Sequence, residues 1–140
     1  YEIQFGDWSS DVCSSDLAWD RRFAAAYLAV PSFGNHPVRV TLPCVGSGEA
    51  VRLYYKEHPE GLDVLKYYDS AVHARRIQIP VMCECALFDP AVPPPGQFSV
   101  YNALGGPKQL VVSQAGHFDY SGKEAEAQRF LALQADWFAR

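Results

Sequence analysis

The chain alternates between short apolar runs and polar or proline-rich segments, as strands and helices that follow one another do. Residues Pro80–Phe88 form a continuous apolar run rich in strand-forming side chains, which indicates a strand buried on both faces of a parallel sheet. After a proline tract, Gln97–Leu104 predicts a helix closed by two glycines, and Gln109–Ser113 predicts a second strand. The order strand, helix, strand predicts one βαβ unit of an α/β protein.

Further elements flank this unit on both sides. Residues Phe23–Val30 predict a short buried strand. The helical spacing of apolar positions in Leu62–Ile77 is interrupted near Asp69, which favours two short helices with a cap at Asp69 or Ser70. The last segment, Gly122–Arg140, has the spacing of an amphipathic helix that packs back on the sheet. We therefore expect an α/β fold with parallel strands flanked by helices.

Two segments differ from this pattern. Residues 1–17 are rich in Ser and Asp and lack periodicity, and their stretch WSSDVCSSDL resembles the translation of a sequencing adapter. We expect a non-native leader there, with an ordinary disordered leader as the alternative, and a protein that begins near Ala18. Residues 31–62 contain proline-flanked loops and a predicted surface helix. We expect this segment to be an insertion over the carboxyl edge of the sheet, where such segments shape substrate pockets.

Composition and charge limit the class of protein. The chain has 140 residues, of which 49% are hydrophobic and 20% charged, which suits one soluble globular domain or part of one. The formal net charge is −4 without a cluster of Lys or Arg, which argues against nucleic acid or an anionic membrane and favours a small neutral substrate. No apolar run approaches the ~20 residues that span a bilayer. No signal peptide is visible, although a truncated amino terminus would hide one.

The cysteines do not indicate a disulfide framework. Outside residues 1–17 there are three, Cys44, Cys83 and Cys85, and this odd count favours a reducing compartment. The localisation is therefore open, with the cytoplasm favoured. We assign Cys83 and Cys85 to opposite faces of one strand, which would prevent them from binding one metal ion together, and we expect buried free thiols. The sequence indicates no metal and no organic cofactor.

The candidate chemistry lies at the ends of the two strands of the βαβ unit. Asp89 directly follows the first strand, and the prolines of residues 90–95 prevent that strand from continuing, so Asp89 lies in a rigid loop. His117 follows the second strand, 28 residues later. Open α/β sheets bind ligands at the carboxyl ends of their strands, and Asp before His is the order of a Ser-Asp-His triad in α/β hydrolases. Alone, each residue would be a solvated or capping side chain. Together they predict the acid and base of a hydrolase.

The nucleophile of such a triad should precede Asp89. Ser32 is in the correct chain order, but Val30 occupies a position where a nucleophile elbow needs a small residue, and Pro37 prevents an immediate helix. A pocket-lining role is favoured instead. The candidates for that role lie in the loops at the strand ends: Ser32, Phe33, Val92 and Phe118.

Several motifs resemble those of a known family. Residues Leu62–His117 resemble the acetyl xylan esterase and cephalosporin C deacetylase family of α/β hydrolases, through KYYDSAVHARRIQIPV, LFDPAVPPP, YNALGGPKQL and the AGH loop. Residues Phe23–Arg52, with AVPSFGNHP and TLPCVGSGEA, are similar to the stretch after the nucleophile helix in that family. The resemblance covers essentially Ala18–Arg140. It implies that Asp89 is the triad acid and His117 the general base.

The resemblance has two departures. The family commonly has Glu directly after the histidine, where this chain has Phe118, so the substrate range or oligomer contacts of family members do not transfer. The serine elbow and the segments of the oxyanion hole would lie upstream of Ala18.

We therefore expect residues 18–140 to be the carboxyl-terminal portion of an α/β-hydrolase domain. The intact protein would be a serine carboxylester hydrolase that removes short acyl groups, above all acetyl, from a carbohydrate ester. The fragment alone is expected to be inactive, because acid and base form no acyl-enzyme without the serine and the oxyanion donors. A homo-oligomer of the intact protein is compatible with the sequence. Two alternatives stay open: a serine peptidase of the same fold, and a noncatalytic α/β binding module in which Asp89 and His117 are polar loop residues.

Overall fold

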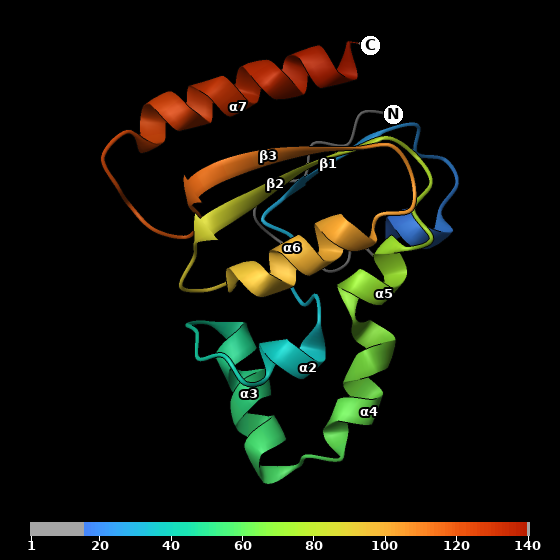
Figure 1. The fold of residues 1–140 in the computed structure, drawn as a ribbon, viewed down its shortest axis with the longest axis vertical. Helices are drawn as coiled ribbons and strands as arrows, with labels where there is room; N and C mark the ends of the chain where they lie inside the picture. Colours follow the sequence, from blue (N-terminus) through green and yellow to red (C-terminus); the bar gives the residue numbers. More distant parts are fainter. Residues whose placement is uncertain (1–15, 140) are drawn as a thin grey trace.

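A parallel sheet and the helices around it make up the described part of the chain. The computed structural model describes residues 16–139. Figure 1 shows the sheet with α7 on one face and α6 on the other. In chain order the elements are β1 (Ala26–Ala29), α2 (His36–Arg39), α3 (Ser47–Glu57), α4 (Gly61–Leu65), the 3₁₀ helix η1 (Lys66–Tyr68), α5 (Ser70–Ala74), β2 (Val81–Phe88), α6 (Pro94–Ala103), β3 (Lys108–Ala115) and α7 (Lys123–Phe138).

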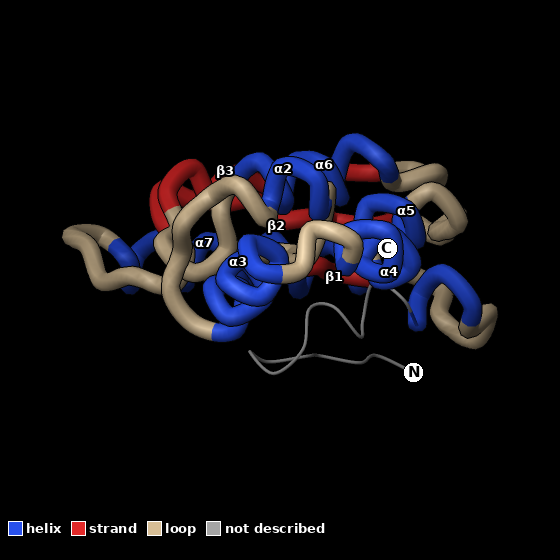
Figure 2. The backbone as a smooth tube through the Cα atoms, turned by 90° about the horizontal axis from the view of Figure 1, so that it is seen from below, coloured by secondary structure: helices blue, strands red, loops and turns tan. Residues whose placement is uncertain are grey.

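The sheet has β2 in its centre. The strand order is β1-β2-β3, and both pairs are parallel, with Cys83 of β2 opposite Leu28 of β1 and Leu110 of β3. Figure 2, turned by 90°, shows β2 between its two neighbours. A central parallel strand needs apolar side chains on both faces, which explains why the apolar run before Asp89 forms β2. The expected α/β fold, with parallel strands flanked by helices, is confirmed.

The first strand is shorter than the predicted Phe23–Val30. It begins at Ala26, and Val30 has a left-handed φ of 50°, so the chain turns away from β2 after Ala29. A β-branched residue rarely adopts this conformation, and the sequence pattern alone gives no sign of it. The Val30 N–H still donates to the Glu84 carbonyl at 2.9 Å. Strand β2 continues past this point, and its register with β1 ends at Glu84.

Apolar side chains pack on both faces of the sheet. On the α7 face, Met82 and Val111 pack against Phe130, which is the buried residue of α7. On the α6 face, a larger cluster joins the strands to α5 and α6. Its buried members are Ala26, Leu28, Ala74, Ile77, Val81, Cys83, Cys85, Val100 and Leu104.

The assignment of Cys83 and Cys85 to opposite faces of the strand is wrong. Side chains two residues apart on a strand point to the same face, and the two Sγ atoms lie 3.8 Å apart in the α6-side cluster. Both are buried free thiols, as expected. The hydrogen bond with Cys85, together with burial, raises the pKa of the Cys83 thiol. The thiolate that a metal ion would need is therefore disfavoured, and the pair packs as small apolar side chains.

The remaining predicted elements differ from the observed ones at their ends. Helix α6 begins at Pro94, before the predicted Gln97, because proline is tolerated in the first turn of a helix. Strand β3 is longer than the predicted Gln109–Ser113 at both ends. Helix α7 lies within the predicted terminal helix and ends at Phe138.

Residues 30–80 connect β1 to β2, and the helices of this segment lie on the α6 side of the sheet (Figure 1). Helix α2 packs against α6 and α4. The pair of short helices expected in Leu62–Ile77 is observed as α4 with η1, followed by α5, whose N-cap is Asp69. The description of residues 31–62 as an insertion stays a prediction. The non-native leader also stays a prediction, because residues 1–15 lie outside the described residues.

Asp69 fixes the loop after β1 to the start of α5. The residue is only 4% exposed. Its Oδ1 accepts the N–H groups of Asn35 and Ala71, each at 2.9 Å, and its Oδ2 accepts the N–H of His36 at 2.8 Å. Three backbone donors thus share one buried carboxylate.

We expect Asp69→Ala to lower the free energy of unfolding by about 1–3 kcal/mol, because three buried or half-buried N–H groups lose their acceptor. Denaturant unfolding followed by circular dichroism measures the change. The control is Asp63→Ala, which removes an exposed carboxylate paired with Lys66 and should leave the unfolding midpoint nearly unchanged. Equal midpoints for the two variants would contradict the role of Asp69.

Candidate active site

Asp89 is the first residue after β2, and its side chain is 0% exposed. Its Oδ1 accepts the N–H of Ala91 at 2.8 Å and the N–H of Val92 at 2.9 Å. The chain therefore turns back on the carboxylate directly after the strand, in the manner of an Asx turn. We refer to residues 89–92 as the acid loop. A carboxylate removed from water is costly without donors, and this loop supplies two of them from its own backbone.

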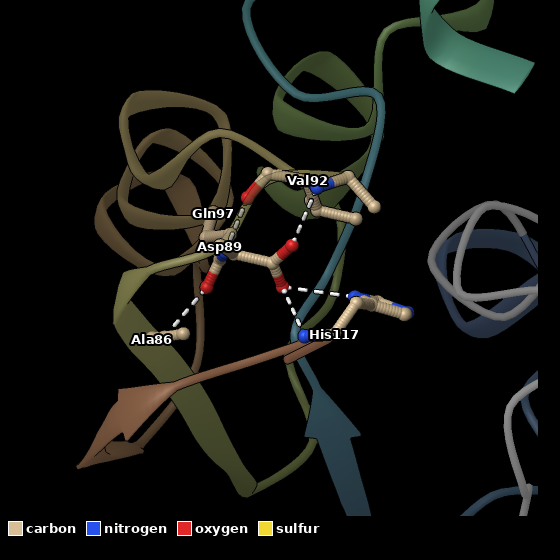
Figure 3. Close-up of polar contacts among 6 residues, drawn as sticks. Ala86, Asp89, Val92, Gln97 and His117 are labelled. Atoms are coloured by element: carbon tan, nitrogen blue, oxygen red, sulfur yellow. Dashed lines mark hydrogen bonds and ion pairs between the residues drawn. The ribbon is translucent and has the colours of Figure 1, made fainter. Parts of the chain in front are cut away.

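The other oxygen of Asp89 contacts the loop after β3. Oδ2 lies 2.9 Å from Nδ1 of His117 and 3.3 Å from its backbone nitrogen (Figure 3). The His117 side chain is 48% exposed, so the imidazole lies between a buried carboxylate and the molecular surface. The predicted proximity of the two side chains is confirmed. In the neutral ring, the contact with Asp89 favours the proton on Nδ1 and leaves Nε2 as an acceptor.

Gly116 makes this contact sterically possible. Its N–H donates to the Phe88 carbonyl at 2.9 Å, which brings the end of β3 against the end of β2. A Cβ on Gly116 would lie 1.8 Å from Oδ2 of Asp89. Only glycine leaves room for the carboxylate here. The sequence pattern gives Gly116 no role of its own, and its position next to His117 is the available signal.

Gln97 connects the acid loop with β2, a role that the sequence pattern does not indicate. Its side chain lies in α6 and is 0% exposed. Oε1 accepts the N–H of Ala86 at 2.7 Å, and Nε2 donates to the Val92 carbonyl at 2.6 Å (Figure 3). Because α6 also carries Ser99 and Asn102, one more polar residue on this helix gives no distinctive signal in the sequence.

A cavity of about 930 Å³ lies beside His117. His117 and Phe118 line it together with the end of β1, Glu84 of β2 and the inner side of α7. None of the described residues that line it is a serine, threonine or cysteine. The described cavity walls therefore include the imidazole that contacts Asp89 but no serine, threonine or cysteine side chain.

Two tyrosines near the cavity are hydrogen-bonded to carboxylates. Tyr120 lines the cavity and donates to Glu126, and this hydrogen bond raises the pKa of Tyr120 to about 12. Tyr27 donates to Glu84, and burial together with this bond raises the pKa of Tyr27 further above its ordinary value. Both hydroxyls stay protonated at neutral pH, so neither supplies a phenolate nucleophile.

The sequence-predicted pocket residues occupy different places. Phe118 lines the cavity and packs edge-on against Phe88, with ring centroids 5.6 Å apart. Val92 belongs to the acid loop through its N–H on Asp89. Ser32 and Phe33 lie in the loop after β1 and are not among the residues that line this cavity. Substrate contact by these four side chains stays a prediction.

The surroundings of Ser32 differ from a nucleophile elbow. The left-handed residues of its loop are Val30, Phe33 and Asn35, whereas Ser32 itself does not have a positive φ. The next helix, α2, begins only at His36. A strained strand-to-helix turn centred on the serine, which an elbow requires, is therefore not formed at Ser32.

Neither a metal site nor a membrane-spanning helix is found in the part of the chain that the structure describes. Within residues 16–139, no group of three or more His, Cys, Asp or Glu side chains is arranged to hold a metal ion. None of the helices in the same range is long and apolar enough to cross a bilayer.

Solved structures with the same arrangement of strands and helices are α/β hydrolases. The acetyl xylan esterase from Paenibacillus sp. R4 matches with a TM-score of 0.72 and 23% identity, over 89% of this chain and 42% of its own. Acetyl Xylan Esterase 1 from Thermoanaerobacterium sp. JW/SL YS485 matches with a TM-score of 0.67 and 20% identity, over 86% and 41%. The α/β hydrolase GrgF from Penicillium sp. sh18 matches with a TM-score of 0.58 and 19% identity, over 91% and 58%. The chain thus has the fold of an α/β hydrolase.

The family can be stated more narrowly from the sequence. The family model described as acetyl xylan esterase matches residues 19–135. The chain therefore belongs to the acetyl xylan esterase family, and the resemblance seen in its motifs is confirmed. No curated protein matches the sequence at a significant level. The chain spans less than half the length of the two acetyl xylan esterases described above.

We expect Gly116→Ala to separate Asp89 from His117, because the added methyl group would occupy the place of Oδ2. The free energy of unfolding should fall by about 1–3 kcal/mol, as for other overpacked sites. The NMR resonance of the His117 Nδ1 proton, which is observed while a hydrogen bond slows its exchange with water, should disappear.

The control for this variant is Gly46→Ala. Gly46 has a positive φ of 79° but no atom within 4 Å of an added Cβ, so the substitution brings backbone strain without displacing Asp89. The Nδ1 resonance should persist in this control. Its persistence in the Gly116 variant as well would show that Gly116 is not required for the contact.

Proposed function

We propose that the chain is the carboxyl-terminal portion of a serine carboxylester hydrolase that removes acetyl groups from carbohydrate esters. The observation that carries the proposal is the 2.9 Å contact between the buried Asp89 carboxylate and Nδ1 of His117, at the carboxyl end of the sheet. Membership of the acetyl xylan esterase family supports ester hydrolysis as the reaction. The two similar structures named acetyl xylan esterases support an acetylated carbohydrate as the substrate class.

In this proposal His117 is the general base and Asp89 the triad acid. Nε2 of His117 takes the proton of the serine hydroxyl as the oxygen attacks the ester carbonyl. It then returns a proton to the leaving sugar alkoxide when the tetrahedral intermediate collapses. Asp89 holds the tautomer in which Nε2 is the acceptor, and it stabilises the imidazolium formed between the two proton transfers. Water then deacylates the serine by the same route.

The burial of Asp89 supports this role. A charge without exposed surface is poorly screened, so its attraction for an adjacent imidazolium is stronger than that of a surface carboxylate. Four contacts hold its two oxygens in place, three of them from backbone N–H groups. The carboxylate therefore does not have to reorganise when the imidazole gains its proton.

The serine and the oxyanion donors are proposed to come from a segment outside residues 18–140. The described walls of the cavity beside His117 contain no serine, threonine or cysteine, which supports this assignment. In the described sheet, β1 has a strand neighbour on one side, so its other edge can accept a further parallel strand. We use the term extended protein for the natural protein that joins such a segment to this chain.

In the extended protein, we expect His117→Ala and Asp89→Asn each to lower kcat/KM for a small acetyl ester by about 10⁴-fold. The first substitution removes the base, and the second favours the wrong tautomer. Ser32→Ala should have far less effect. Turnover of an aryl acetate and of acetylated xylo-oligosaccharides measures these changes, with a peptide anilide as the test of a peptidase.

The outcomes separate the candidate functions. Near-normal turnover by the His117 variant would remove His117 from the chemistry, and a collapse in the Ser32 variant would identify Ser32 as the nucleophile. Cleavage of the peptide anilide without ester turnover would favour the peptidase. A natural protein that has neither activity nor a G-x-S-x-G elbow would favour the binding module.

The 140-residue chain by itself should not react with a fluorophosphonate probe and should not hydrolyse an acetyl ester, because no serine is activated within it. Mass spectrometry of the probe-treated chain detects labelling, and the extended protein is the positive control. Stoichiometric labelling of a serine in this chain, with loss of ester turnover, would show that the nucleophile lies within it.

A further inference from the structure

We propose that Gln97 is a positioning residue that fixes the acid loop, residues 89–92, to the end of β2 and so holds the Asp89 carboxylate against His117. That Gln97 positions Asp89 is inferred from the geometry alone. That this positioning affects catalysis rests on the function proposed above. Gln97 contacts no residue of the His117 loop directly, and it acts through Val92 and Asp89.

The amide oxygen of Gln97 accepts a hydrogen bond that β1, which ends before this point, does not accept. Val30 donates to the Glu84 carbonyl and then turns away, so β1 offers no acceptor farther along β2. Ala86 lies two residues beyond Glu84 and presents its N–H on the same side of β2. Oε1 of Gln97 accepts this N–H at 2.7 Å. The glutamine side chain thus continues the hydrogen bonding of the sheet where the neighbouring strand ends.

The second end of the amide holds the acid loop. Nε2 donates to the Val92 carbonyl at 2.6 Å, while the N–H of Val92 donates to Asp89 Oδ1 at 2.9 Å. Both polar groups of Val92 are therefore used, one on Gln97 and the other on Asp89. A shift of Val92 moves a donor of the carboxylate directly.

The orientation of the amide is determined by its two partners. A backbone N–H requires the amide oxygen, and a backbone carbonyl requires the amide nitrogen, so the reversed orientation would set donor against donor and acceptor against acceptor. The side chain is completely buried, so water cannot replace either partner. Through these two hydrogen bonds Gln97 sets the distance between β2 and the acid loop.

Helix α6, which carries Gln97, is packed firmly against its neighbours. Helix α6 carries Val100 and is followed by Leu104, both in the core cluster on the sheet. Near its amino terminus, Gly96 approaches Gly34 so closely that a Cβ on Gly34 would lie 2.5 Å from the Gly96 carbonyl oxygen. The acid loop has one further tie, from the Val45 N–H to the Pro90 carbonyl at 2.8 Å. Loss of Gln97 should therefore loosen the Val92 side of the loop without unfolding all of it.

The variants isolate this effect. Gln97→Met keeps the length and burial of the side chain but removes both hydrogen bonds. Gln97→Glu keeps the acceptor for Ala86 and, when ionised, places a negative oxygen against the Val92 carbonyl. Leu104→Ala removes a buried apolar contact after the same helix and leaves both hydrogen bonds in place. It is the control for loss of stability alone.

The first measurement is the His117 Nδ1 proton resonance in the 140-residue chain, recorded at matched fraction folded for each variant. We expect the resonance to be lost or strongly broadened in Gln97→Met, and in Gln97→Glu only at a pH at which the introduced carboxyl is ionised, and retained in Leu104→Ala. Retention in Gln97→Met would overturn the inference. Loss in Leu104→Ala as well would also overturn it, because general destabilisation would then explain the effect.

A second measurement needs no substitution. In the unchanged chain, the Ala86 N–H should be protected from hydrogen exchange as strongly as the N–H groups of β2 that pair with β1 or β3. The Gln97 side-chain amide should give two separate, slowly exchanging proton resonances. Fast exchange at Ala86, or an averaged amide signal, would overturn the inference even if neither Gln97 variant folds.

The third measurement separates this inference from the proposed function. In the extended protein, Gln97→Met should lower kcat for an acetyl ester at least tenfold with little change in KM, because Gln97 acts on the acid rather than on bound substrate. Activity that depends on His117 but not on Gln97 would reject the inference and keep the function. A resonance that depends on Gln97 in a protein without ester turnover would keep the inference and reject the function.

Discussion

A carboxylate removed from water must find protein donors for both of its oxygens, and the segment after β2 has a composition that meets this need for Asp89. Of residues 90–93, two are prolines, which have no N–H to donate. The N–H groups that the segment does have, on Ala91 and Val92, both point to Oδ1. The proline tract thus does more than end the strand, because it fixes the turn in which the two available donors converge on one oxygen. Oδ2 is left for a partner from elsewhere in the chain.

That partner is supplied by the register of the sheet. Phe88 at the end of β2 pairs with Ala115 at the end of β3, so the residues that follow the two strands leave the sheet side by side. Gly116 then passes over Asp89 without a side chain, and the next residue, His117, places both its N–H and its ring on Oδ2. A separation of 28 residues in sequence therefore becomes a direct contact. The same geometry explains why a larger residue before His117 would displace the acid.

The parts of this site that could be predicted are those with a local signature. Asp89 and His117 follow recognisable strands, and neighbouring parallel strands end at one edge of a sheet, so their meeting follows from pattern and topology. Gln97 and Gly116 have no such signature, because the N–H that needs an acceptor and the carboxylate that needs space belong to segments distant in sequence. The end of β1 before Val30 is equally absent from the sequence pattern, since a left-handed valine contradicts local preference and its N–H is held by the carbonyl of Glu84, which is distant in sequence. Sequence patterns therefore indicated that Asp89 and His117 meet, but not which residues surround their contact.

Asp89 and Asp69 differ in one property that separates a candidate catalytic carboxylate from a structural one. Both are buried and both accept three backbone N–H groups, so burial and hydrogen-bond count do not distinguish them. The donors that the described residues present to Asp69 are all backbone amides, which act neither as acids nor as bases near neutral pH, so Asp69 joins a loop to α5 without a group that could take up a proton. Asp89 in addition contacts the imidazole of His117. The other ring nitrogen of His117 can accept a proton, and His117 lines a cavity. A proton gained at Nε2 places a positive charge beside a fixed negative one, and this coupling between a buried charge and an exposed basic nitrogen is the property that general-base catalysis requires.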